Sequence, residues 1–100
     1  MPDAIIYRLP PKVSLETVAK AATRSGPCAD ATHYPEWPDW QTDGGFDRWE
    51  LDFGNNYKLY PEEAIPKDCF VFASRYGDTD LSREYQAALI KAGCVRIGSR

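Results

Sequence analysis

The only histidine of this 100-residue chain, His33, lies five residues after Cys28. A thiol nucleophile needs a base within hydrogen-bond reach, and that base needs a third group to orient it. Asp30 or Asp39 would supply such a carboxylate in the same stretch of chain. No family signature of a cysteine enzyme surrounds these residues, so we predict an ordinary loop histidine and no catalytic residue. A small thiol-dependent enzyme that uses Cys28 and His33 is the main alternative.

Zinc binding is the second chemistry that these residue types allow. Four side chains, those of Cys28, His33, Cys69 and Cys94, match the number of ligands in a tetrahedral zinc site. They lack the short Cys-x-x-Cys spacing of such sites. Cys69 and Cys94 lie at the edges of apolar runs, where a reduced thiol packs as a small apolar side chain. We therefore predict no metal ligand and no cofactor, and a zinc protein belongs to the same alternative.

Acids and tryptophans gather in one part of the chain. Positions 30–52 hold seven acids and one arginine, a net charge of −6, which leaves +3 for the rest of a chain whose total is −3. All three tryptophans lie in the same window. A charge asymmetry of this kind says more about binding partners than about fold.

The segment 33–45, HYPEWPDWQTDGG, concentrates these features and supports two interpretations. Its aromatic side chains can fold back onto a small core. Alternatively, at least one tryptophan stays exposed among carboxylates that steer a basic partner, as at interface hot spots. We favour the second interpretation. The predicted partner-binding residues are Tyr34, Glu36, Trp37, Asp39, Trp40, Asp43, Asp47 and Glu50.

Two helices are indicated by apolar residues that recur on one helical face. The first follows Ser14, which can cap its N-terminus, and ends at the Gly26-Pro27 pair. The second follows Asp80 as its predicted cap and ends at Gly93. A single helical turn is also predicted at 61–66, between two prolines.

Short apolar or alternating runs predict the strands. They are expected at 4–9, 46–53, 57–60, 69–73 and 95–97. The strand 46–53 alternates, so we expect Trp49, Leu51 and Phe53 to face the core. The predicted solvent-facing residues of this strand are Arg48, Glu50 and Asp52.

Prolines and glycines break any period between 27 and 45, so this stretch is predicted as a long loop before the central hairpin. The element order predicts a single α+β domain over residues 1–100. Two helices should cover one face of a mostly antiparallel sheet of four to five strands. The two β-α-β halves suggest a ferredoxin-like arrangement with a long inserted loop.

Nucleic-acid binding has to be considered, because a ferredoxin-like sheet is the scaffold of RNA-recognition motifs. The run KDCFVFAS (67–74) resembles the aromatic strand motif of that family over a few residues. The glycine of that motif is replaced by Asp68 or Val71, depending on the register, and its last aromatic is missing. The acidic middle of the chain would also repel phosphate. We therefore do not expect a nucleic-acid partner.

The sequence favours a binding protein. No apolar run approaches the roughly 20 residues of a membrane helix and no signal peptide is evident, so we expect a cytoplasmic protein without a membrane partner. We predict a stoichiometric inhibitor that covers a basic surface of a partner protein with its acidic, tryptophan-rich patch. In composition, though in no motif, the chain resembles phage anti-defence proteins such as anti-CRISPR proteins, and toxin-immunity proteins. A phage structural or assembly subunit is a further alternative.

Overall fold

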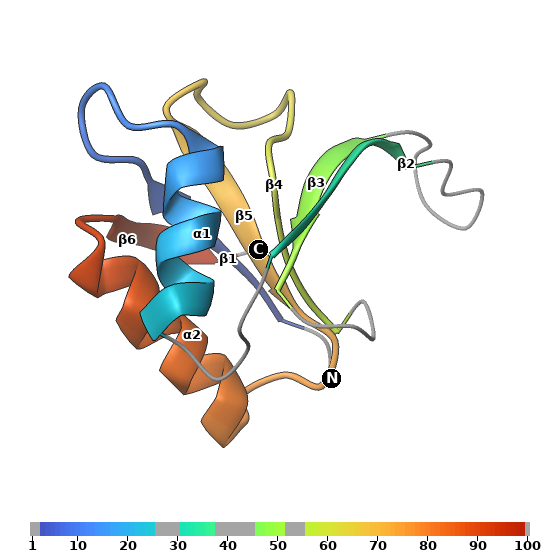
Figure 1. Cartoon of the computed structure of the whole chain (residues 1–100), viewed down its shortest axis with the longest axis vertical. Helices are drawn as coiled ribbons and strands as arrows, with labels where there is room; N and C mark the ends of the chain where they lie inside the picture. The colour runs from blue at the N-terminus through green and yellow to red at the C-terminus, as the bar shows by residue number, and fades with distance from the viewer. Residues whose placement is uncertain (1–2, 26–30, 38–45, 52–55, 100) are drawn as a thin grey trace.

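The computed structural model describes residues 3–25, 31–37, 46–51 and 56–99 (Figure 1). In this part of the chain, six strands form one sheet of order β2-β3-β4-β5-β1-β6, in which all neighbours are antiparallel. The strands are β1 (Asp3–Arg8), β2 (Thr32–Trp37), β3 (Phe46–Glu50), β4 (Tyr57–Tyr60), β5 (Cys69–Ser74) and β6 (Val95–Ser99). The helices α1 (Leu15–Ser25) and α2 (Asp80–Lys91) lie together on one face. The predicted α+β architecture is therefore confirmed.

Four of the strands have the order of a split β-α-β fold. β5 lies between β1 and β4, and β1 lies between β5 and β6. Because β1 and β4 are both antiparallel to β5, they are parallel to each other, and the same holds for β5 and β6 around β1. The ferredoxin-like arrangement suggested by the sequence is present in these four strands. β2 and β3 extend the sheet beyond β4, which gives six strands instead of the predicted four to five.

The hydrophobic core lies between the helices and one face of the sheet. Ile5 and Tyr7 of β1 stand opposite Phe72 and Phe70 of β5, and all four side chains are buried. Because residues two apart share a face of a strand, these four form one apolar surface at the centre of the sheet. The buried faces of α1 and α2 cover it with small and medium side chains. They are Val18, Ala19, Ala22, Ala88 and Leu89, together with the large aromatic side chain of Tyr85.

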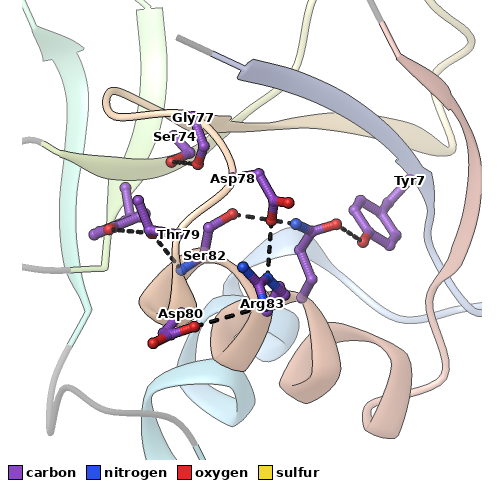
Figure 2. A network of polar contacts seen from close by, with 10 residues as sticks. Tyr7, Ser74, Gly77, Asp78, Thr79, Asp80, Ser82 and Arg83 are labelled. Carbon is purple, nitrogen blue, oxygen red and sulfur yellow. Dashed lines mark hydrogen bonds and ion pairs between the residues drawn. The ribbon is translucent and has the colours of Figure 1, made fainter. Parts of the chain in front are cut away.

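The start of α2 is fixed to the sheet by side-chain hydrogen bonds (Figure 2). The Thr79 hydroxyl accepts a hydrogen bond from the Ser82 N–H at 3.0 Å and lies 3.0 Å from the Tyr57 hydroxyl. Further along the helix, the Tyr7 hydroxyl donates to Gln86 Oε1 at 2.6 Å, and Gln86 Nε2 donates to Ser82 Oγ at 3.1 Å. These bonds join two strands of the sheet to the first two turns of α2.

One of the two predicted helix caps is confirmed and the other is wrong by one residue. Ser14 Oγ accepts from the Thr17 N–H at 3.2 Å, as expected of an N-cap. The cap of α2 is Thr79 and not Asp80. Both residue types cap helices well, and the Tyr57 contact selects Thr79. Asp80 instead lies in the first turn, where it pairs with Arg83 at 3.6 Å.

Two predicted local structures are wrong. The segment 61–66 forms a turn, with the Ile65 N–H bonded to the Glu62 carbonyl at 3.4 Å, and no helical turn. Residues 32–37, expected within a long loop, form β2. A strand at the edge of a sheet tolerates Pro35, because only one side of it must supply hydrogen bonds, and the register shifts between Tyr34 and Trp37.

Gly93 offers a test of the turn that joins α2 to β6. Its φ is +99°, and a Cβ at this position would lie 3.0 Å from Pro10 Cγ. We expect Gly93→Ala to lower the free energy of unfolding by about 1–3 kcal/mol, measured by urea denaturation. Gly98→Ala is the matched control, because a Cβ at Gly98 has no neighbour within 4 Å. An equal loss in both variants would contradict this account of the turn.

Candidate partner-binding site

β2 and β3 form an antiparallel hairpin at one edge of the sheet, extending away from the two helices (Figure 1). At its far end the backbone of Trp37 pairs with that of Phe46. This pair joins the two ends of the segment 38–45, which contains Asp39, Trp40 and Asp43. These three predicted binding residues lie outside the described residues, and so do the side chains of the predicted residues Glu36, Trp37 and Asp47.

The outer face of the hairpin, opposite the helices, carries a buried polar cluster. Arg48 is only 2% exposed and Glu50 only 7%, so the prediction that these two residues face water is wrong. β3 is an interior strand, with β2 on one side and β4 on the other. Glu50 stands opposite Lys58 of β4, and Tyr34 stands opposite Arg48. Asp52, the third residue expected in water, lies outside the described residues.

The Glu50 carboxylate accepts a hydrogen bond from another member of this cluster. The Tyr34 hydroxyl donates a hydrogen bond to the Glu50 carboxylate, and this bond raises the pKa of Tyr34 above its ordinary value of 10.0. The negative charge of Glu50 acts in the same direction, and the nearby positive charge of Arg48 acts against it. The described part of the hairpin therefore presents a polar cluster of Tyr34, Arg48, Glu50 and Lys58, in which two positive charges accompany the charge of Glu50. Sequence reasoning placed Arg48 on the same face as Glu50 but missed Lys58, because only the strand register places Lys58 beside Glu50.

On the helix side of the hairpin, His33 packs against Trp49. Their rings are stacked, with centroids 4.3 Å apart and planes inclined by 10°. Trp49 is buried, as predicted, whereas His33 is exposed and covers it at the sheet edge. This contact gives His33 a packing role. The proposed pairing of His33 with Cys28 falls on a residue outside the described part of the chain.

The two described cysteines are buried thiols in different surroundings. Cys94 belongs to the core, and burial raises the pKa of its thiol to about 11. Cys69 lies in β5 and its thiol is 3.5 Å from Asp68, and burial also raises its pKa. A thiolate is the form that binds metals and attacks substrates, so both thiols are held in the less reactive form. Among the described residues, no three potential metal ligands lie together.

The aromatic residues of the 67–74 run do not lie on an open sheet face. Phe70 and Phe72 point toward the helices and are buried in the core. RNA-recognition motifs instead stack bases on aromatic side chains that the sheet exposes. The local resemblance to that family therefore does not extend to the surface that binds RNA.

Comparisons with models of protein families, with curated proteins and with solved structures found no match to this chain. In the described part of the chain, neither helix has the length and apolar character needed to cross a membrane.

The packing role of His33 can be tested by substitution. We expect His33→Ala to lower the free energy of unfolding by about 0.5–1.5 kcal/mol, because it uncovers the Trp49 ring. His33→Phe retains a flat ring and should recover most of that loss in the same urea denaturation experiment. If His33→Ala is as stable as the parent protein, the stacked pair does not support the hairpin.

The hydrogen bond from Tyr34 to Glu50 predicts a change in titration. Glu50→Gln removes the negative charge that disfavours the phenolate, so the pKa of Tyr34 should fall toward 10.0. The measurement is a pH titration of tyrosine ring carbons by NMR, with Tyr34→Phe to identify the signal. In the parent protein the raised pKa stabilises the fold below about pH 10, and this contribution is lost as the pH rises through the folded-state pKa. An unchanged pKa in Glu50→Gln would exclude the hydrogen bond.

Proposed function

We propose that this protein is a cytoplasmic, stoichiometric inhibitor that binds a basic surface of a partner protein through the end of its β2–β3 hairpin. We call the residues 36–47 the hairpin end. It contains four acids, no basic residue and two tryptophans. Its partner-binding residues are Glu36, Trp37, Asp39, Trp40, Asp43 and Asp47.

The observation that carries this proposal is the backbone pairing of Trp37 with Phe46. Only eight residues separate the two, and an extended residue spans at most about 3.6 Å. The paired strands therefore hold both ends of a short connecting segment, and binding residues are commonly found on short segments held by a rigid scaffold.

The electrostatics of the hairpin support a basic partner. Glu50 stands opposite Lys58 and lies with Arg48 beside the Tyr34 hydroxyl, so two positive charges lie near its negative charge. The four acids of the hairpin end have no basic residue in their own segment. Uncompensated acids around an aromatic anchor accelerate the approach of a basic surface and fix its orientation. Binding of this kind would block whatever substrate or nucleic acid the partner's basic surface normally meets.

The position of Phe46 suits a contact made without the turn that follows β5. The strand registers place Trp49 beside Leu59 and Tyr60 beside Val71. Phe46 therefore lies toward the end of the sheet where β5 begins, and the turn after β5, with the exposed Tyr76, lies at the opposite end. A partner can cover the hairpin end without touching that turn.

Substitutions in the hairpin end should weaken the complex. Once the partner is identified by affinity capture and mass spectrometry, we expect Trp40→Ala to weaken binding about 30-fold, as at an interface hot spot. Trp37→Ala should act in the same direction, and the melting temperature should change little in either variant. Tyr76→Ala is the matched control, because it removes an exposed aromatic side chain at the other end of the sheet and should leave affinity unchanged.

The acids give the same experiment a second readout. Asp39→Asn with Asp43→Asn should weaken binding, and the affinity of the parent protein should fall with added salt, because exposed charges are screened over about 8–10 Å at physiological ionic strength. A complex that is insensitive to salt would argue against the acidic hairpin end. Variants that only unfold the protein, together with capture of no partner, would show that the segment serves stability.

A further inference from the structure

β6 forms the edge of the sheet opposite the β2–β3 hairpin. It pairs with β1 on one side, and within the described residues no strand pairs with its other side. Every second backbone N–H and C=O of an edge strand points away from the sheet. Such a row of groups can bind a further strand.

The two edges of the sheet differ in how well they are protected against pairing with a further strand. β2 contains Pro35, which lacks an N–H, and its pairing with β3 shifts register. β6 has no proline, although its pairing with β1 also shifts register between Ile6 and Tyr7. Val95 and Ile97 of β6 are 57% and 42% exposed, which is unusual for β-branched side chains in a strand. β6 is therefore the edge that offers a further strand both backbone hydrogen-bonding groups and exposed apolar side chains.

The surroundings of β6 are basic. The chain has no acid after Glu84, and residues 85–100 contain Lys91, Arg96 and Arg100. Lys91 and Arg96 are exposed, and neither forms an ion pair in the described part of the chain. A second copy of this edge would bring the same positive charges together. Charge complementarity favours an acidic strand.

We infer that β6 binds an extended segment of a partner protein, in which acidic and β-branched apolar side chains alternate. Val95 stands opposite Arg8 and Arg96 stands opposite Tyr7, so these neighbours project from opposite faces of the sheet. An added strand must therefore present an apolar residue beside Val95 and an acid beside Arg96. Its backbone would complete the hydrogen bonds of β6, and its acids would contact Arg96 and Lys91.

The test uses NMR of the full-length, isotope-labelled protein and a capped nine-residue peptide of alternating glutamate and valine. We expect chemical-shift changes in the backbone amides of β6 and β1, and no response to the same peptide with lysine in place of glutamate. Arg96→Glu should weaken binding of the acidic peptide at least about tenfold, and Arg96→Gln should weaken it less. The amide spectra of both variants report directly whether they are folded.

Ile90→Gln is the control, because it changes an exposed residue without changing the charge, and Ile90 lies on α2 and not on the edge strand. It should bind the acidic peptide as the parent protein does. Absence of any β6 shift at millimolar peptide, or equal binding of the lysine peptide, would overturn the inference. Broadening of the β6 amides with rising protein concentration and no peptide would assign the edge to a second copy and overturn it as well. Because hairpin-end variants should leave peptide binding intact, the result is independent of the proposed function.

Discussion

The antiparallel pairing of β1 with β5 is the contact on which the rest of the fold depends. The Tyr7 and Phe70 rings are stacked with centroids 5.9 Å apart, and Ile5 stands opposite Phe72 on the same face. Full burial of a large apolar side chain stabilises a protein by about 1.5–3 kcal/mol. β6 attaches to β1, β4 attaches to β5, and both helices cover the surface that this pair creates. The Tyr7 hydroxyl also donates a hydrogen bond to Gln86, so this one residue joins the sheet to α2 both by packing and by a hydrogen bond.

The hairpin lies several strands away from this central pair and is held by different interactions. Trp49 extends the core toward the sheet edge, and the outer face is occupied by the cluster of Tyr34, Arg48, Glu50 and Lys58. A buried charged group contributes little net stability, because desolvation offsets its attraction to partners. The cluster has a larger effect on the register in which the strands pair. A slip of one residue would turn Arg48 and Glu50 toward the core and Trp49 toward the outer face. We therefore regard the cluster as the feature that fixes how β2, β3 and β4 align.

The sequence predicted the elements whose pattern is local and missed what depends on distant neighbours. The helical faces of α1 and α2 and the apolar runs of β1 and β5 follow from periodicity within each segment. β2 was not predicted, because Pro35 interrupts its pattern. Only its pairing with β3 identifies it as a strand. Alternation correctly placed Arg48 and Glu50 on the face opposite Trp49. It could not show that this face is buried, because that depends on the flanking strands. The acids and Trp40 of the hairpin end remain predictions from the sequence.

The charge asymmetry of the sequence corresponds to a separation across the sheet. The acidic window of residues 30–52 includes the strands at one edge, and the basic segment 85–100 includes the strand at the other. Opposite charges at two edges of one sheet would favour head-to-tail association of copies, which leads to open filaments when the geometry does not close. Strand addition at the β2 edge is hindered by Pro35, which lacks an N–H. The same proline that kept β2 from being recognised in the sequence therefore opposes pairing of the acidic edge with the basic one. The two partners that we propose would then bind at separate edges of the sheet.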